Sequence, residues 1–138
     1  MGSGSSMERR HHSTGTPWEE SVAYSRAVRV GPYVYVSGTT ASQADGTTVS
    51  PGDAYAQTAY VLAKIGASLA AVGANMSDVV RTRMFVTDIS RWEEFGRAHG
   101  EVFRGINPVS TMVEVRRLIN ADHLIEIEVD AVVSENER

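Results

Sequence analysis

An α+β sandwich, in which two helices pack on one face of a single mixed β-sheet, is the fold class that the sequence predicts. Three observations lead to this prediction. Strand-like segments with alternating apolar residues lie before, between and after two helical segments. The length of 138 residues suits one ordinary domain. An apolar fraction of 42% and a charged fraction of 22% are typical of a folded globular chain.

The composition disfavours several classes of function. A formal net charge of -4 argues against a nucleic-acid partner, because phosphate recognition usually leaves a basic surface. The sequence contains no cysteine, which excludes disulfides, thiolate metal sites and a cysteine nucleophile. No apolar run approaches the length of about 18 residues that a membrane span requires, so we expect no membrane partner and a cytoplasmic location. His11 and His12 lack further ligands at suitable spacing, and no metal site is expected.

The N-terminal segment is expected to lie outside the domain. The letters MGSGSS before Met7 resemble a cloning remnant, and no apolar segment of a secretory signal follows them. We therefore expect residues 1–15 to form a tag remnant and flexible tail, and residues 16–138 to form one domain.

Two strands and a third, short one are expected before the first helix. Residues 21–30 alternate and predict the first strand, in which Val22, Tyr24, Val28 and Val30 share one side. The dipeptide GP then predicts a turn, and the segment YVYVSG predicts a second strand that ends at Gly38. A loop with the turn signal ADG follows, with a short strand expected at residues 47–49.

The first helix is the most clearly marked element. Ser50 suits the N-cap, Pro51 suits the first helical position, and Asp53 suits the electropositive first turn. Gly73 is the expected stop. Residues at a spacing of three or four predict one buried stripe: Thr58, Val61, Leu62, Ile65, Leu69 and Val72.

A strand, a second helix and two further strands complete the chain. The strand begins at about Val80 and is expected to have one core face and one mixed face. The core set is Val80, Thr82, Met84 and Val86, and the mixed set is Arg81, Arg83, Phe85 and Thr87. A capping box of Ser90 and Glu93 predicts the helix start. Its inner stripe is expected to contain Trp92, Phe95, His99, Val102 and Phe103. The last two strands are expected at about residues 109–118 and 124–133.

The second face of the sheet is predicted to be mixed in polarity. On the last strand the expected helix-facing set is Ile125, Ile127, Val129, Ala131 and Val133, and the opposite set is Glu126, Glu128, Asp130 and Val132. The neighbouring strand is expected to add Ser110, Met112, Glu114 and Arg116 to this second face. We interpret the face as a subunit interface, because tyrosines 24, 33 and 35 would otherwise be partly exposed. The alternative is a monomer with a solvated sheet.

Four stretches, in order and at their spacings, resemble the RidA / YjgF family of reactive-intermediate deaminases, formerly also labelled endoribonuclease L-PSP. These stretches are YSRAVRVGPYVYVSG, GDAYAQTAYVLAKIGASLAAVGANMSDVVRTRMFVTDI, NPVSTMVEVRRL and LIEIEVDAV. The resemblance covers residues 21–133, which is nearly the whole domain.

This resemblance implies a chorismate-mutase-like subunit and a homotrimer with a central barrel. Small-molecule ligands would bind in clefts between subunits, and no cofactor or metal would be needed. In deaminating members an arginine binds the substrate carboxylate, and a glutamate helps to position the water that attacks an imine. Glu126 matches that glutamate and is the candidate catalytic residue. The candidate substrate-binding residues are Tyr24, Ser37, Gly38, Phe85, Gly96, Ser110 and Thr111.

Two positions depart from the family pattern. The deaminase signature Pro-Ala-Arg-Ser/Thr here reads Pro108-Val109-Ser110-Thr111, so Ser110 stands in place of the arginine. A serine offers one neutral hydrogen bond, whereas a guanidinium offers a charged, bidentate grip. The position that is often asparagine on the second helix is Gly96. A usual 2-iminoacid would therefore bind roughly a hundredfold more weakly unless another cation substitutes.

Arginine and histidine residues outside the candidate set have other expected roles. Arg83 and Arg116 are expected to form surface or interface ion pairs with Glu114, Glu126 or Glu128, although an arginine from a neighbouring subunit remains an alternative. His99 is interpreted as a packed helix histidine, and His123 is expected to be exposed.

The sequence is compatible with three functions. The first is hydrolysis of an imine or enamine other than the usual 2-iminoacids, in clefts between the subunits. The second is a non-catalytic trimer that binds a small molecule. The third, RNA cleavage, is disfavoured by the acidic net charge and by the lack of a basic aromatic stripe.

Overall fold

Six strands form one mixed sheet in the order β1-β2-β3-β6-β4-β5 in the computed structural model, which describes residues 8–134. The strands are β1 (Arg9–His12), β2 (Ala27–Val30), β3 (Tyr33–Thr40), β4 (Val79–Val86), β5 (Val109–Glu114) and β6 (Ile125–Val132). β4 and β5 are parallel, and all other neighbours are antiparallel. The expected cloning remnant, residues 1–6, lies outside the described residues.

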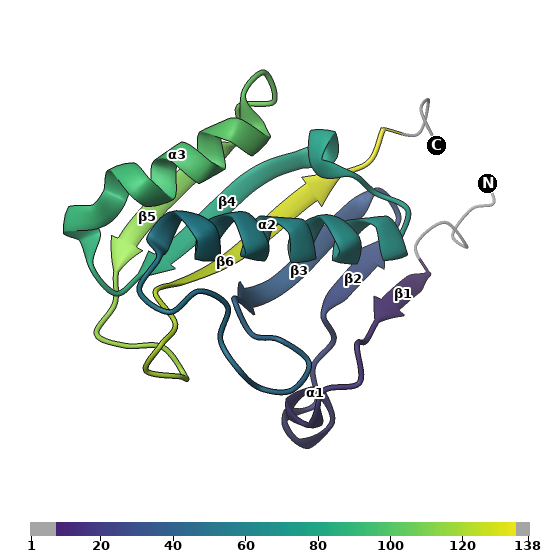
Figure 1. The fold of residues 1–138 in the computed structure, drawn as a ribbon. Helices are drawn as coiled ribbons and strands as arrows, with labels where there is room; N and C mark the ends of the chain where they lie inside the picture. Colours follow the sequence, from purple (N-terminus) through teal and green to yellow (C-terminus); the bar gives the residue numbers. More distant parts are fainter. Residues whose placement is uncertain (1–7, 135–138) are drawn as a thin grey trace.

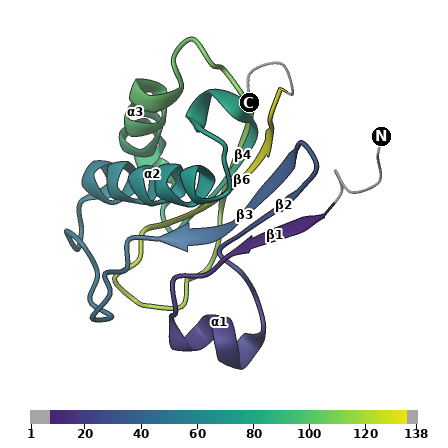
Figure 2. The same ribbon diagram turned by 90° about the vertical axis from the view of Figure 1, so that its right-hand side faces the viewer.

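Two long helices cover one face of this sheet, as Figures 1 and 2 show. They are α2 (Ala54–Ala71) and α3 (Trp92–Phe103), and each connects one strand to the next on the same side. A short helix, α1 (Pro17–Val22), lies apart from them beside the N-terminal strands (Figure 2). Two 3-10 turns, η2 (Met76–Asp78) and η3 (Ile89–Arg91), lie on either side of β4 along the chain. The predicted α+β sandwich is confirmed.

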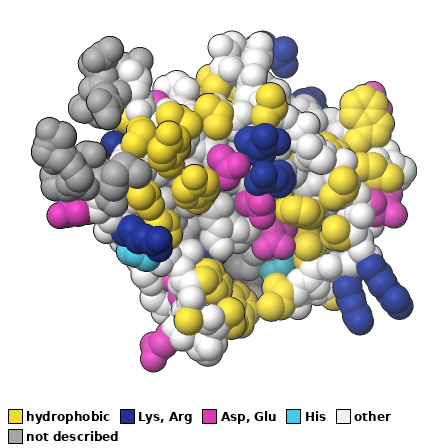
Figure 3. Space-filling view, turned by 180° about the vertical axis from the view of Figure 1, so that it is seen from behind, with side chains coloured by type: hydrophobic (Ala, Val, Ile, Leu, Met, Phe, Trp, Pro, Cys, Tyr) yellow, Lys and Arg dark blue, Asp and Glu magenta, His cyan; other side chains and the backbone are white. Residues whose placement is uncertain are grey.

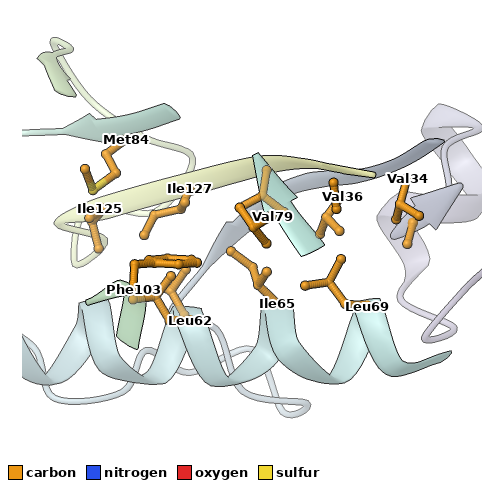
Figure 4. Packing of buried hydrophobic residues seen from close by; sticks show 14 of the residues in the cluster. Val34, Val36, Leu62, Ile65, Leu69, Val79, Met84, Phe103, Ile125 and Ile127 are labelled. Atoms are coloured by element: carbon orange, nitrogen blue, oxygen red, sulfur yellow. The ribbon is translucent and has the colours of Figure 1, made fainter. Parts of the chain in front are cut away.

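The core lies between α2 and the sheet (Figure 4). Leu62, Ile65 and Leu69 point from α2 toward the sheet, as the helical spacing predicted, and all are at most 1% exposed. Phe103 joins them from α3. Full burial of one such side chain contributes about 1.5–3 kcal/mol, so this layer supplies much of the free energy that holds α2 on the sheet.

Strand β6 shows the predicted alternation. Its helix-facing side chains are at most 2% exposed: Ile125, Ile127, Val129 and Ala131, continued by Val133. Glu126, Glu128, Asp130 and Val132 take the opposite face, here called the open face because α2 and α3 do not cover it. Since β6 lies between β3 and β4, these acidic residues are central in the sheet.

The N-terminal region differs from the prediction. Residues 9–12 form β1 and pair with β2, within the segment that was expected to be a flexible tail. Residues 17–22 form α1 rather than the beginning of a strand, so Tyr24 lies in the following loop. The helix forms because Pro17 occupies its first turn and the Thr16 side chain accepts a hydrogen bond from the Glu19 backbone N–H.

Both long helices begin later than predicted, because in each case an aspartate side chain accepts a hydrogen bond from a backbone N–H near the helix start. Asp53, rather than Ser50, caps α2 and accepts a hydrogen bond from the Ala56 N–H at 2.9 Å. Asp88 accepts one from the Ser90 N–H at 3.0 Å, which forms η3 before α3 begins. The predicted Ser90 capping box was therefore wrong. Gly73 ends α2 as predicted, with φ of 81°.

Three smaller predictions also need correction. A bulge between Val79 and Arg81 inserts Val80 into β4, which leaves Val80 45% exposed instead of in the core. Trp92, in the first turn of α3, is 56% exposed. The expected strand at residues 47–49 is a single bridge between Ser42 and Thr48.

Candidate functional site

The open face of the sheet carries charged residues surrounded by apolar ones (Figure 3). Arg81 and Arg83 of β4 lie beside Asp130 and Glu128 of β6 in register. Around them, partly exposed apolar side chains come from β3, β5 and β6: Tyr33, Tyr35, Val109, Val113 and Val132, each at least 41% exposed. Several exposed apolar side chains gathered on one face are typical of a surface that another protein covers.

The charged centre is an ion-pair ladder. Arg83 Nη1 lies 3.1 Å from Glu128 Oε2 and 3.4 Å from Asp130 Oδ2. Arg81 Nε lies 3.7 Å from Asp130 Oδ2. The predicted pairing of Arg83 with Glu128 is confirmed. Exposed ion pairs contribute little, typically about 0–1 kcal/mol. If a neighbour excluded water, the Coulomb attraction within each pair would increase, against the cost of desolvating the charges.

Glu126 stands apart from this ladder, against the backbone of β3. A β-bulge interrupts β3 between Val36 and Thr39, so that Ser37 and Gly38 have no ladder partner on β6. A Cβ atom built at Gly38 would overlap Glu126 Oε2 and lie 2.9 Å from the carboxyl carbon. Only glycine leaves room for the carboxylate at this point. Two candidate site residues, Gly38 and Glu126, are thus in contact.

The surroundings of Glu126 change its acidity. Burial raises the pKa of the Glu126 carboxyl, the nearby positive charge of Arg26 lowers it, and the negative charge of Glu128 raises it, with a net rise. A carboxylate with a raised pKa is a stronger base near neutral pH than an ordinary surface glutamate. Phe85 of β4 is the cross-strand partner of Glu126 and lies beside it on the open face.

Arg26 is a site residue that the sequence reasoning missed. Its Nη2 donates hydrogen bonds to the Gly38 carbonyl at 3.0 Å, the Ser37 carbonyl at 3.3 Å and Thr39 Oγ1 at 2.6 Å. The guanidinium carbon lies 5.9 Å from the centre of the Tyr24 ring. Arg26 thereby links three predicted residues, Tyr24, Ser37 and Gly38. No motif marks it, because only the bulge brings these carbonyl groups to one side chain.

Ser110 lies on the helix-covered face, contrary to the prediction. It pairs with Thr82 in the parallel β4–β5 ladder, and Thr82 is fully buried toward the helices. Thr82 Oγ1 donates a hydrogen bond to Ser110 Oγ at 2.7 Å and lies 2.9 Å from His99 Nε2. Neighbouring residues of a strand point to opposite faces, so Thr111 takes the open face, beside Arg83. Ser110 and Thr111 therefore cannot line the same pocket within one chain.

The other predicted residue near Ser110 is on α3. Gly96 lies one turn before His99, and a Cβ added at Gly96 would meet only the Trp92 ring, at 4.0 Å. His99 stacks on Phe103 with ring centres 4.6 Å apart, which agrees with its interpretation as a packed histidine. A hollow of about 220 Å³ lies beside it at the start of β5, lined by His99, Gly100, Phe103, Arg104, Asn107 and Pro108.

One chain therefore presents two groups of candidate residues on different sides of the sheet. The first group surrounds Glu126 and includes Ser37, Gly38 and Phe85, with Tyr24 joined through Arg26. The second consists of Ser110 and Gly96 near α3.

His123 was expected to be exposed, but it is only 2% exposed. Its Nε2 lies 3.0 Å from Ser42 Oγ, because the loop after β3 folds over the start of β6.

Within residues 8–134, no cluster of histidine, aspartate and glutamate side chains is arranged to hold a metal ion. Among the same residues, no helix is long and apolar enough to cross a bilayer.

Comparison with known proteins places the chain in a family. The family model described as endoribonuclease L-PSP matches residues 16–133. The chain belongs to this family. The resemblance to the RidA / YjgF family that the sequence motifs indicated is thereby confirmed, since this family name and the L-PSP label apply to the same group of proteins.

Similar proteins match three quarters or more of this chain. An uncharacterized protein of Streptomyces coelicolor is 36% identical over 122 residues, 88% of this chain and 90% of the relative. A RutC family protein of Pyrococcus abyssi is 32% identical and covers 76% of this chain and 82% of the relative. The crystal structure of a YjgF/YER057c/UK114 family member from Mycobacterium tuberculosis superposes with a TM-score of 0.83 at 48% identity, covering 91% of this chain and all (100%) of that one.

Proposed function

We propose that this L-PSP family chain is a small-molecule hydrolase that deaminates an imine or enamine, with Glu126 as the base that orients water. The observation that carries the proposal is the position of the Glu126 carboxylate, which is half-buried against Gly38 on the open face. Burial raises the pKa of this carboxyl, which suits a group that must accept a proton near neutral pH.

The proposed reaction needs only water and one proton-transfer group. The water oxygen adds to the carbon of the protonated imine while one water proton passes to Glu126. Glu126 returns this proton to the nitrogen, the C–N bond breaks, and the remaining hydroxyl proton leaves with the nitrogen. The products are a carbonyl compound and ammonium, and no oxidant or reductant enters the balance.

The proposed site lies between copies of the chain in a homotrimer. Two features support this assembly: the exposed apolar side chains on the open face, and the placement of Ser110 and Glu126 on different faces of one sheet. A ligand that contacts both residues needs one of them from a second chain. The substrate is proposed to differ from the usual 2-iminoacids, because Ser110 gives one neutral hydrogen bond where a bidentate cation would hold a carboxylate.

A non-catalytic trimer that binds a small ligand is the second candidate. It is favoured by the simultaneous loss of two polar groups, at Ser110 and Gly96, from the pattern of deaminating members. RNA cleavage is not proposed, because the net charge is -4 and acidic side chains occupy the middle of the open face.

Ammonia release separates the two candidates. Imines generated in place by an amino-acid oxidase would be offered to the wild-type protein, to Glu126→Gln and to Glu128→Gln. Glu128 is the matched control, two residues along the same strand and face. We expect the wild type and Glu128→Gln to release ammonia at pH 8 and Glu126→Gln to be slower by a factor of about 100 or more. Release by none of the proteins from any imine would favour the binding trimer.

A further inference from the structure

Two ionisable side chains hold one loop against the start of β6. The loop spans residues 41–53 and connects β3 to α2, at the end of the sheet where β6 begins (Figure 1). His123 Nε2 lies 3.0 Å from Ser42 Oγ, and Lys64 Nζ donates a hydrogen bond to the Ser42 carbonyl at 2.9 Å. Because both contacts meet at Ser42, a change of charge on either group affects how the loop is held.

The His123 ring is closed off from water. The residue is only 2% exposed, and within residues 8–134 its Nδ1 is buried without a hydrogen-bond partner. Among the same residues, Thr48 Oγ1 of the loop is also buried without a partner, so no hydrogen bond joins it to the ring. A neutral imidazole tolerates this setting, because its single proton can sit on Nε2 and leave Nδ1 as a bare acceptor.

A second proton has no suitable place on this ring. Both nitrogens of a protonated imidazole are donors. Ser42 Oγ can accept from Nε2, but in the part of the chain that the structure describes Nδ1–H would be a buried, charged donor without an acceptor. Such a group loses its hydration without compensation, which is a large cost. Movement of the loop away from the ring lets water act as the missing acceptor.

The charged groups around His123 add to this effect. Lys64 acts on the ring from α2 and Asp122 from the turn before β6, while the loop side is formed by the neutral Ser42. Burial lowers the pKa of the His123 ring, the positive charge of Lys64 lowers it further, and the negative charge of Asp122 raises it, with a net fall. A protonated His123 would therefore repel the ammonium group that holds the same loop.

We propose that protonation of His123 releases the 41–53 loop from the start of β6 in mildly acidic solution. The closed loop disfavours the second proton, so the closed state binds fewer protons than the open one. The stability of the closed loop is therefore complete above the ordinary histidine pKa of about 6.5 and falls below it, by up to about tenfold per pH unit, until the lowered pKa of the closed state is reached. The loop continues β3, in which Thr40 is the cross-strand partner of Glu126, so its release loosens the strand end beside the proposed base.

Hydrogen exchange of single amides in the full-length protein tests the release. The Val49 N–H, bonded to the Ala41 carbonyl at 2.8 Å, reports on the loop, and the Ala74 N–H, bonded to the Leu69 carbonyl at 2.9 Å, is a reference at the end of α2. After correction for the intrinsic pH dependence of exchange, we expect the protection of Val49 to fall about tenfold or more between pH 7 and pH 5 relative to that of Ala74.

Two variants assign this change to one ring. In His123→Gln, which has no ring to protonate, the protection of Val49 should be the same at both pH values. His99→Gln is the matched control and should keep the fall, because His99 lines the hollow at the start of β5 and does not contact the loop.

A measurement on the wild type keeps the test valid if a variant folds poorly. In ¹⁵N-labelled protein, the ring signals of His123 should show a proton on Nε2 at pH 7 and should change on acidification together with the protection of Val49. If Val49 keeps its protection while the His123 ring becomes protonated, or keeps it down to pH 5, the inference is wrong. An equal fall in His123→Gln would assign the change to another group and would also overturn it. No substrate enters this test, so its result is independent of ammonia release.

Discussion

The Glu126 carboxylate of β6 lies directly against the backbone of Gly38 in the β3 bulge. The two residues are 88 positions apart in the sequence (126 minus 38) and meet because β3 and β6 are neighbours in the sheet. The missing side chain at Gly38 creates the space, and the bulge turns this position out of the ladder. The position of the proposed base thus depends on a residue that carries no chemistry of its own.

Replacement of Gly38 by alanine should displace the Glu126 carboxylate, because the new Cβ would lie 2.9 Å from the carboxyl carbon. We expect Gly38→Ala to remain folded and to lose at least about 90% of ammonia release, since a displacement of about 1 Å can cost 100-fold in rate. Gly66→Ala is the control, because its Cβ meets nothing nearer than the Met76 sulfur at 3.8 Å. Unchanged activity in Gly38→Ala would show that the carboxylate position is unimportant.

The pH profile should report the unusual acidity of Glu126. A base must be deprotonated, and burial raises the pKa of Glu126, so ammonia release should fall on the acid side at a higher pH than an ordinary glutamate would cause. Arg26 lowers this pKa and Glu128 raises it. Arg26→Gln should therefore move the acid limb to higher pH, and Glu128→Gln should move it to lower pH. If ammonia release fell at the same acidic pH in all three proteins, the role of Glu126 would be contradicted.

The sequence was informative where one periodicity decided the structure. The stripe of α2 and the alternation of β6 each place large apolar residues on a single side, so the packed face follows directly. Strand β5 is different, because both of its sides carry small or apolar residues: Ser110 and Met112 on one, Val109 and Val113 on the other. Its inward side depends on pairing with β4, which local pattern does not reveal.

Around Glu126 too, the sequence identifies some residues but not the contacts between them. Gly38 and Glu126 could be named from the family motifs, but their contact depends on the bulge in β3. Arg26 went unnoticed because its role arises from backbone carbonyls that the bulge exposes. The first helix, α1, was missed although Thr16, Pro17 and Glu19 form an ordinary helix start.

The chain of hydrogen bonds from Ser110 through Thr82 to His99 should add stability. Thr82 gives its only hydroxyl proton to Ser110, so its oxygen must accept from His99 Nε2. Burial lowers the pKa of His99, which favours the neutral ring near pH 7. The hydrogen bond to Thr82 then assigns the ring proton to Nε2. Thr82→Val leaves that N–H without a partner and should destabilise the fold by about 1–3 kcal/mol. Ser110→Ala, at the exposed edge strand, should cost less.

Chemical denaturation of both variants measures this difference, and ¹⁵N spectra of the wild type identify the His99 tautomer. A proton on Nδ1 at pH 7 would contradict the assigned direction of the hydrogen bonds.

Glu19 should make the N-terminal region sensitive to acid. Its buried carboxylate accepts hydrogen bonds from Ser13 Oγ at 2.5 Å, the Thr14 N–H at 2.9 Å, Thr14 Oγ1 at 2.5 Å and Thr16 Oγ1 at 2.8 Å. Burial alone would raise the pKa of Glu19, but these bonds lower it to about 2. Since the folded pKa lies below the unfolded one, the stabilisation is complete above the ordinary glutamate range and is lost as the pH falls toward about 2.

Replacement of Glu19 by glutamine should remove this acid dependence. The glutamine amide turns its N–H₂ group toward hydrogen-bond donors. We therefore expect the stability of the N-terminal region to fall by about 1–3 kcal/mol at neutral pH. Hydrogen exchange of the β1 and β2 amides should be faster in Glu19→Gln than in the wild type at pH 6, and this difference should shrink as the pH falls through the titration of Glu19. Glu20→Gln, at the exposed neighbouring position of α1, serves as the control and should exchange like the wild type. Equal exchange in Glu19→Gln and Glu20→Gln at pH 6 would mean that pairing with β2 alone holds β1 in place.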